Sequence, residues 1–425
     1  MKKHGWIFLG VTFFWGLFFI AINAYALSPE TALLLKLLEK KGVITQEEGD
    51  ALRQEVEAAA PPALDKEAIK AEIKEEITQE LKDEGGPLAG IQDNITISGA
   101  VEVDYQYLDH RDRTDKGSDG TSDLYASTIE LGIQAQVNES TTANIIFKAE
   151  DVDKSTNAAN NNDGSDPDNP FIDEATITIY NPEKCPFYAV LGKRGQPFGN
   201  FFTHTVSDPV TKAAYEVATT GATVGFAPAD FYDLDVAFTA YKGEKLINAL
   251  NGAGTGWARS NTAYAPTDDV SSYIASLSLK PIEALTLGVA FDSEPGDGDR
   301  NETFNASAEL LMFDVILDGE YFVATSREKH LTDDKTYKEK AWVVGLAYHV
   351  VDPLELSVRF EKFDVDHDSD QDGDFDYIFA FGANYELLQN VTLMGEYRRV
   401  VQETAAGSTY EETVNEYNLR VAVGF

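Results

Sequence analysis

The 425-residue chain has little of two things: cysteine and positive charge. The single cysteine, Cys185, excludes an internal disulfide framework. Only 34 Lys and Arg stand against 72 Asp and Glu, which gives a net charge of −38. A chain of this charge repels phosphates, which argues against nucleic acid as a partner. Simple attraction to anionic lipid headgroups is disfavoured for the same reason.

Long hydrophobic runs are missing beyond residue 26. No stretch there reaches the roughly 18 apolar residues that a membrane-spanning helix needs, so a helical membrane protein is excluded. The mean hydropathy of −0.26 is ordinary for a soluble protein. It is equally ordinary for a transmembrane β-barrel, in which polar and apolar side chains alternate along each strand.

The first 26 residues have the layout of a secretory signal peptide. Lys2 and Lys3 precede an apolar run over 7–22, and Ala24-Tyr25-Ala26 forms a small-x-small cleavage site. The rival interpretation is a membrane anchor, but the run is shorter than the roughly 20 residues of a spanning helix. The residue directly after the predicted cleavage site is not a cysteine, which disfavours a lipoprotein anchor. We expect the mature chain to begin near Leu27.

Residues 27–90 have helical spacing and form a predicted periplasmic segment. One apolar set recurs at positions Leu33, Leu34, Leu37 and Leu38, and another at Ile69, Ile73, Ile77 and Leu81. The second set is a narrow stripe on a highly charged helix. Either a short coiled coil for oligomerisation or docking, or a solvated spacer helix, accounts for it, since strict heptads do not persist.

From about residue 91 to Phe425 the period changes to two. Ile95, Ile97, Val101 and Val103 alternate with polar neighbours, and the last residues, 417–425, alternate in the same way. Such alternation over 9–11 residues is typical of a tilted strand with lipid on one face and water on the other. Counting these runs predicts sixteen strands: 94–107, 123–137, 141–151, 173–180, 187–194, 220–227, 232–242, 270–280, 284–293, 302–311, 313–325, 340–350, 354–364, 376–387, 391–402 and 414–425.

The connections between these strands alternate between short turns and long loops, as in outer-membrane barrels. The alternatives are a soluble β-sandwich and a periplasmic β-helix. Sixteen strands are too many for one sandwich. Aromatic residues recur near strand ends, and the chain ends on an aromatic residue in phase with the apolar face, Phe425. A terminal Phe resembles the signal that the barrel-assembly machinery selects. We therefore predict an all-β transmembrane barrel in the outer membrane of a Gram-negative bacterium.

The side chains of opposite parity are predicted to face the lumen. A closed lumen filled by paired charges is the alternative, but sixteen strands enclose room for a water-filled channel. The predicted pore-lining residues carry both signs: Glu102, Asp104, Glu130, Lys148, Arg194, Glu320, Arg359, Glu361, Arg398 and Arg420.

Loop 195–219 is the candidate constriction of the pore. It is long, rich in Gly and aromatics, and poor in acid. An external surface loop has a similar composition, so both positions stay open. The residues that would narrow the pore are Gln196, Phe198, Phe201, Phe202 and His204.

The acidic run from 368 to 374 resembles the first half of a calcium loop, with oxygens at Asp368, Asp370, Asp372 and Asp374 and a glycine at the sixth position. Position twelve is Phe379 rather than Glu, so this is no EF-hand. Weak Ca²⁺ binding is one interpretation and a solvated acidic loop the other. No other cofactor is expected. The six His show no ligand spacing and no catalytic constellation stands out, so an enzyme is not expected.

Several segments resemble the LbtU-like siderophore porin family. The strongest is residues 174–209, EATITIYNPEKCPFYAVLGKRGQPFGNFFTHTVSDP, joined by Ile97-Ser98-Gly99-Ala100-Val101-Glu102-Val103, Glu130-Leu131-Gly132 and Val137-Asn138-Glu139. The resemblance covers most of the mature chain. It implies a plug-less barrel that takes up ferric siderophores across the outer membrane.

Three functions remain open. The chain is expected to be a porin for passive or facilitated diffusion, with ferric siderophore or other small nutrients as the solute. A porin of this kind can also be a homo-oligomer. The alternative is a structural or adhesive barrel that tethers the envelope through its N-terminal helices.

Overall fold

The computed structural model describes residues 94–111, 120–154, 169–229, 231–255, 269–296, 298–329, 335–365, 375–402 and 412–425. The predicted signal peptide (1–26), the predicted helical segment (27–90) and the acidic run at 368–374 lie outside them. None of the helices within the described ranges is long and apolar enough to cross a membrane.

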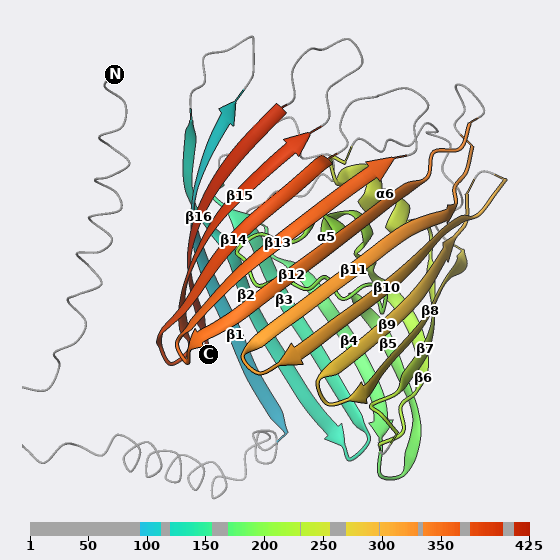
Figure 1. The fold of residues 1–425 in the computed structure, drawn as a ribbon. Helices are drawn as coiled ribbons and strands as arrows, with labels where there is room; N and C mark the ends of the chain where they lie inside the picture. Colours follow the sequence, from blue (N-terminus) through green and yellow to red (C-terminus); the bar gives the residue numbers. More distant parts are fainter. Residues whose placement is uncertain are drawn as a thin grey trace, which may run out of the picture. The chain divides into compact units, whose positions relative to one another are not determined.

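The described residues form one closed antiparallel barrel, in which β1 pairs with β16 and every other strand pairs with its neighbours in sequence (Figure 1). Closure leaves no strand edge with unpaired backbone groups, which hydrocarbon would not tolerate. The sixteen strands are β1 (Ile95–Arg111), β2 (Thr121–Asn138), β3 (Thr141–Val152), β4 (Phe171–Asn181), β5 (Cys185–Gly195), β6 (Ala218–Phe226), β7 (Asp235–Lys242), β8 (Val270–Ile282), β9 (Leu285–Glu294), β10 (Asn301–Met312), β11 (Val315–Ser326), β12 (Glu339–Val351), β13 (Leu354–Val365), β14 (Phe375–Leu388), β15 (Val391–Gln402) and β16 (Glu412–Gly424).

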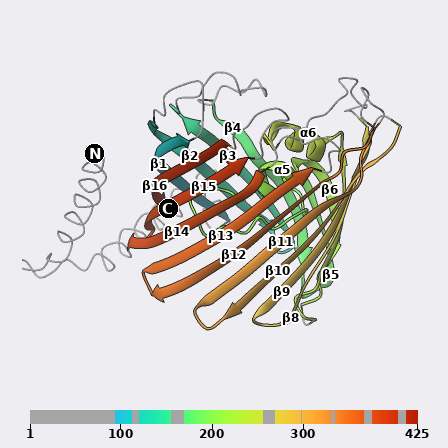
Figure 2. The same ribbon diagram turned by 45° about the horizontal axis from the view of Figure 1, so that its top comes forward.

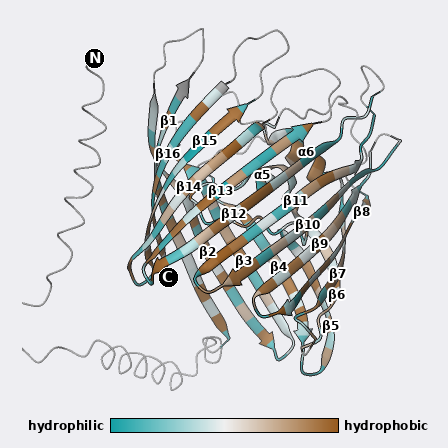
Figure 3. Ribbon diagram, in the orientation of Figure 1, coloured by the Kyte–Doolittle hydropathy of each residue, from teal (hydrophilic) through white to brown (hydrophobic). Residues whose placement is uncertain are grey.

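Each strand sorts its side chains by parity. On β12, Ala341 and Val343 are buried inside the barrel, whereas Val344 and Leu346 are exposed on the outer wall. Figure 3 shows the resulting alternation of hydrophilic and hydrophobic residues along the strands. The outer wall is the surface that lipid covers, so its exposed apolar residues are the ordinary state of a membrane barrel.

The predicted count of sixteen strands is confirmed, and the strand bounds differ from the prediction by a few residues. Among the strands that begin later than predicted, β7 differs most: it begins at Asp235 rather than at residue 232. Tyr232 and Asp233 have φ angles of 54° and 46°, in the left-handed region, so these two residues form a turn before the strand.

The C-terminal residue closes the seam of the barrel. The backbone N–H of Phe425 donates to the carbonyl of Gly99, and that of Gly99 donates to the carbonyl of Phe425, both at 3.0 Å. The Phe425 ring lies over Gly99, where a Cβ would come within 2.4 Å of a ring carbon. A side chain at position 99 would displace this ring and would also come within 2.8 Å of the Glu130 carbonyl oxygen. Recognition of Phe425 by the barrel-assembly machinery stays a prediction.

Two short helices lie inside the ring of strands (Figure 2): α5 (Val210–Tyr215) and α6 (Lys245–Gly252). Neither was predicted, because both lie in segments that lack a long helical period. Their apolar side chains pack against inward-facing residues of β7 to β15 in one buried cluster, which contains Phe198, Val210, Ala214, Tyr215, Val217, Tyr241, Leu246, Ile247, Leu250, Ile274, Ala290, Phe322, Ala341, Phe363, Val365, Ile378 and Val400. One sector of the lumen is therefore filled by an apolar core.

A carboxylate of the barrel wall holds the start of α6. Glu294 on β9 accepts the backbone N–H groups of Lys245, Leu246 and Ile247 at 2.6, 2.8 and 3.1 Å. These are the first N–H groups of the helix, which have no partner within it. The N-cap residue, Glu244, makes no capping bond with its own side chain. Glu294 supplies the cap instead and fixes α6 to the wall.

Two positions at different depths in the bilayer along β12 test whether the outer wall faces lipid. Val344 lies midway along the strand and Val351 at its end, and both are exposed on the outer surface. Val344→Arg should lower the free energy of unfolding by about 2–4 kcal/mol, and Val351→Arg by about 0–1 kcal/mol, because the cost of a cation is greatest at the bilayer midplane. Urea titration of barrels folded into lipid vesicles measures both. Equal effects at the two positions would contradict a lipid-facing wall.

Candidate functional site

The connection from β5 to β6, residues 196–217, folds into the barrel and contacts the opposite wall. Asn200 Nδ2 donates to Ser307 Oγ on β10 at 2.7 Å, and the backbone carbonyl of His204 accepts from Ser357 on β13 and Asn384 on β14. Positive φ angles at Gly199 and Phe201 turn the chain at the inner end of this path. We call residues 196–217 the inward loop.

Three carboxylates of the wall hold the backbone of the inward loop. Glu320 accepts the N–H groups of Asn200 and Phe201 at 2.7 and 3.0 Å. Glu361 accepts that of Val210 at 2.6 Å. Glu396 accepts the backbone N–H of Ser207 at 3.0 Å and its hydroxyl at 2.7 Å. Charged acceptors make stronger hydrogen bonds than neutral ones, so this set fixes the loop firmly. The three residues are Glu320, Glu361 and Glu396.

Arg359 on β13 donates hydrogen bonds to oxygen atoms of the inward loop, whereas the three carboxylates accept from its N–H and O–H groups. It donates to the Ser207 carbonyl at 2.8 Å, to Thr203 Oγ1 at 2.9 Å and to Thr205 Oγ1. Its Nε binds Glu361 Oε1 at 2.8 Å, and both side chains are buried. Removing one member of a buried pair costs about 3–5 kcal/mol because the other charge is left without a partner. Arg359 and Glu361 therefore hold the loop as one unit.

Glycines on the inner wall make room for the inward loop. A Cβ at Gly382 would lie 2.9 Å from Thr205 Cγ2 and 3.1 Å from the His204 carbonyl oxygen. A Cβ at Gly288 would lie 2.5 Å from Ser307 Oγ and 3.5 Å from Asn200 Nδ2. Sequence analysis missed both glycines. The available signal was glycine at the inward parity of a strand, which leaves space for another segment of backbone.

His204 sits between two carboxylates of the wall. Its Nε2 is 3.5 Å from Asp318 Oδ2, and its Nδ1 is 3.4 Å from Glu355 Oε1. The second oxygen of Glu355 is 3.3 Å from His349 Nε2. Asn384 also donates to Glu355 at 3.0 Å. The Asp318 carboxylate beside Nε2 raises the pKa of His204, burial opposes this, and the Glu355 charge adds to the rise.

The aromatic residues of the predicted constriction pack on the wall. Phe198 is fully buried and meets Phe322 edge to face at 5.7 Å, and Phe201 stacks on the same ring at 5.9 Å. Gln196 is buried and donates to the Thr219 carbonyl at 2.6 Å. Phe202 is half-buried. These residues hold the inward loop in place, and others of the loop line the space beside it.

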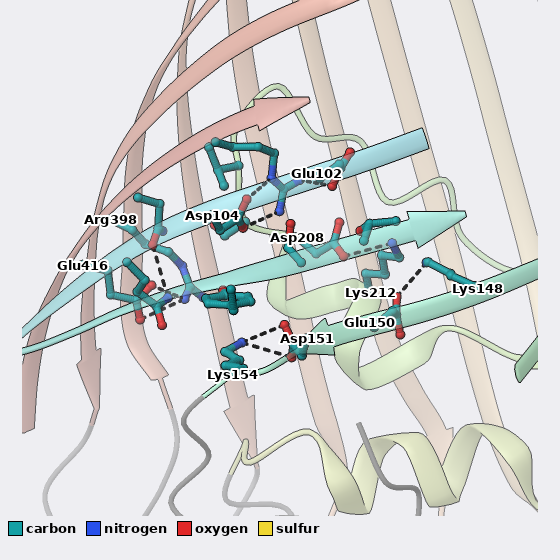
Figure 4. A pocket seen from close by; sticks show the side chains of 18 of the residues that line it. Glu102, Asp104, Lys148, Glu150, Asp151, Lys154, Asp208, Lys212, Arg398 and Glu416 are labelled. Atoms are coloured by element: carbon teal, nitrogen blue, oxygen red, sulfur yellow. Dashed lines mark hydrogen bonds and ion pairs between the residues drawn. The ribbon is translucent and has the colours of Figure 1, made fainter. Parts of the chain in front are cut away.

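A cavity of about 590 Å³ lies between the inward loop and the wall formed by β1–β3, β15 and β16 (Figure 4). The loop contributes Val206, Ser207, Asp208 and Lys212, none of which was singled out from the sequence. For Asp208 and Lys212 the available signal was opposite charge spaced i, i+4 in a segment otherwise poor in acid. The wall contributes six of the predicted pore-lining residues: Glu102, Asp104, Glu130, Lys148, Arg398 and Arg420.

The other four predicted pore-lining residues point inward but do not border this cavity. Glu320, Arg359 and Glu361 are covered by the inward loop that they hold. Arg194 donates to Thr223 Oγ1 at 3.2 Å on the neighbouring strand. Parity places a side chain inside the barrel, but it does not tell which segment covers it.

The charges that line the cavity form pairs. Arg420 binds Asp104 at 2.7 and 2.8 Å and Glu102 at 2.9 Å. The other pairs are Arg398–Glu416 at 3.1 Å, Lys148–Glu150 at 2.7 Å, Lys154–Asp151 at 3.0 Å and Lys212–Asp208 at 2.9 Å. A lining of fixed charges with both signs suits the passage of hydrated polar solutes.

Within the described ranges, no group of three or more His, Cys, Asp or Glu has the arrangement of a metal site. The Ca²⁺ candidate at Asp368, Asp370, Asp372 and Asp374 lies outside those ranges and stays a prediction.

The His204 contacts give a testable pH dependence. We expect the pKa of His204 to lie above 6.5, with Asp318→Asn moving it down. Because the pKa is raised in the folded protein, the ion pairs stabilise the inward loop fully below pH 6.5. This contribution is lost as the pH rises through the raised pKa. NMR titration of the histidines of the mature chain, with His204→Gln for assignment, measures it.

The control for this titration is Asp233→Asn, which removes an exposed carboxylate at the turn before β7. It should leave the pKa of His204 in place. A pKa at or below 6.5, or one that Asp318→Asn does not move, would show that the carboxylates do not hold the protonated ring.

Comparison with solved structures shows the same fold. The outer-membrane channel DcaP of Acinetobacter baumannii matches with a TM-score of 0.58 and 12% identity, over 78% of this chain and 97% of that one. The anion-selective porin of Comamonas acidovorans matches with a TM-score of 0.55 and 12% identity, over 78% and 99%. The trimer form of OmpT from Vibrio cholerae matches with a TM-score of 0.50 and 14% identity, over 78% and 99%.

The family comparison covers most of the barrel. No curated protein sequence matches the chain. The model of the Gram-negative porin family matches residues 86–405, which is more than half of the chain. The fold and the family are those of a channel in the outer membrane. The chain belongs to the Gram-negative porin family.

Proposed function

We propose that this chain is a diffusion porin whose solutes pass through the cavity beside the inward loop. The observation that carries the proposal is the division of the barrel interior. The apolar cluster occupies the sector lined by β7 to β15. The charged cavity occupies the sector lined by β1–β3, β15 and β16. Water and polar solutes enter a charged space far more readily than an apolar core.

The inward loop sets the width of this route. Asp208 and Lys212 border the cavity from one side and Glu130 and Lys148 from the other. The loop is fixed by Arg359 and by carboxylates of the wall, so it presents a rigid rim. A rigid, narrow, charged passage sorts solutes by size and charge, which is how a porin without a plug domain acts.

Chemical narrowing of the cavity tests the route. In a Cys185→Ser background, Lys212→Cys should react with a bulky methanethiosulfonate reagent. Single-channel conductance in planar bilayers should then fall by about half or more, because the added group occupies the passage. The matched control is Glu139→Cys, at the exposed turn between β2 and β3, outside the cavity. If the Lys212→Cys variant is labelled and its conductance stays unchanged, the route for solutes lies elsewhere.

Uptake of ferric siderophore is the second candidate, implied by the family resemblance. The cavity volume of about 590 Å³ favours it, because sites for drug-sized ligands span about 300–1,000 Å³. Proteoliposomes carrying the chain should take up siderophore loaded with radioactive iron, and modified Lys212→Cys should block this. Passage of small sugars without the iron complex would indicate a general porin. A homo-oligomer, suggested by the trimer form of Vibrio cholerae OmpT, also stays a proposal.

A further inference from the structure

Three lysine–carboxylate pairs border the cavity, and in each the carboxylate is the more exposed partner. The Lys148 side chain is 20% exposed and that of Glu150 51%. For Lys154 and Asp151 the values are 28% and 44%. For Lys212 and Asp208 they are 32% and 54%. In each of these pairs the carboxylate side chain therefore presents the larger fraction of its surface to water.

The two arginines of the cavity are held by their partners. Arg420 donates from Nε and a terminal nitrogen to both oxygens of Asp104, and its other terminal nitrogen lies 2.9 Å from Glu102. Arg398 lies 3.1 Å from Glu416, and each of these two side chains is less than one fifth exposed. The bidentate pair of Arg420 with Asp104 is geometrically fixed and keeps its charge. Arg398 contacts both oxygens of Glu416 through a single terminal nitrogen. These arginines offer little to a passing anion.

The lining also contains more carboxylates than cations. Seven acids border the cavity, Glu102, Asp104, Glu130, Glu150, Asp151, Asp208 and Glu416, against the five cations Lys148, Lys154, Lys212, Arg398 and Arg420. Glu130 faces Lys148 in the strand register, yet Lys148 binds Glu150. The surplus of negative charge therefore lies within the cavity itself.

Exposed carboxylates lie on both sides of the cavity. Figure 4 shows the loop pair Asp208–Lys212 together with the β3 pair Lys148–Glu150. Ser127, buried in the same lining, has no hydrogen-bond partner for its Oγ among the described residues. The cavity thus presents carboxylates from the loop and from the wall to a cation within it.

We infer that the passage selects small organic ammonium solutes whose net charge is positive. An incoming ammonium group binds the carboxylate oxygens that the recessed lysines leave exposed, and exchanges with the lysine ammonium at Glu150, Asp151 or Asp208. Opposite charges concentrate a permeant ion locally, and like charges exclude it. The inference rests on the proposed diffusion function, since it names the solute class for the same passage.

The test compares solutes of similar size and different charge. Proteoliposomes holding the full chain are given radiolabelled lysine, glutamine or glutamate. We expect uptake to be fastest for lysine and slowest for glutamate. In the double variant Glu150→Gln/Asp208→Asn, the ratio of lysine to glutamate uptake should fall about threefold, as expected for removal of two partly solvated charges. The reversal potential in a KCl gradient should show K⁺ preference that weakens in the same variant.

The control is Glu139→Gln, which removes one carboxylate from an exposed Lys–Glu pair outside the cavity. It should leave the uptake ratio unchanged. A retained gel shift between heated and unheated samples shows that each variant is folded. Faster uptake of glutamate, or a ratio that the double variant does not change, overturns the inference. Absence of uptake for all three solutes overturns the proposed diffusion function instead.

Discussion

Closure of the sheet is the constraint on which the rest of this structure depends. Hydrocarbon offers no hydrogen-bond partner, so each strand must pair along both edges, and the β1–β16 pairing removes the last free edge. Closure also separates two solvents. Side chains of one parity meet lipid, and those of the other must share a confined interior with any loop that enters it. The chemistry of the lumen is therefore decided by which inward residues a loop covers.

The inward residues divide into two groups that meet different partners. Apolar residues such as Phe322, Phe363 and Ile378 receive α5 and α6 and form a core within the barrel. Charged residues on β1–β3 and β16 remain around a cavity, which Lys212 of α5 borders from the other side. Between the groups, Glu320, Arg359 and Glu361 bind the backbone of the inward loop. Buried polar groups need such partners, so these charges stabilise the loop instead of lining the route.

The strands could be predicted because polar and apolar residues alternate with a period of two along each of them. Counting these alternating segments gave the number sixteen. The turn at Tyr232 and Asp233 could not be predicted, since positive φ at non-glycine residues leaves no clear local pattern. The cavity was only half predictable. Parity identified Glu102 and Arg420, but Asp208 and Lys212 reach the cavity only through the path of the inward loop, which long-range bonds to Glu361 and Glu396 fix.

A shared barrel does not decide what passes through it. This chain has the fold of a porin that is anion-selective, at 12% identity, and function resides in the lining rather than in the fold. A count of charges is also insufficient, because each of the five cations in the cavity is paired with a carboxylate. Selectivity then depends on which partner of each pair faces the water. In the pairs of Lys148, Lys154 and Lys212 the carboxylate side chain is the more exposed partner. An exchange of partners that exposed the ammonium groups would weaken the attraction for cations without changing the net charge of the lining.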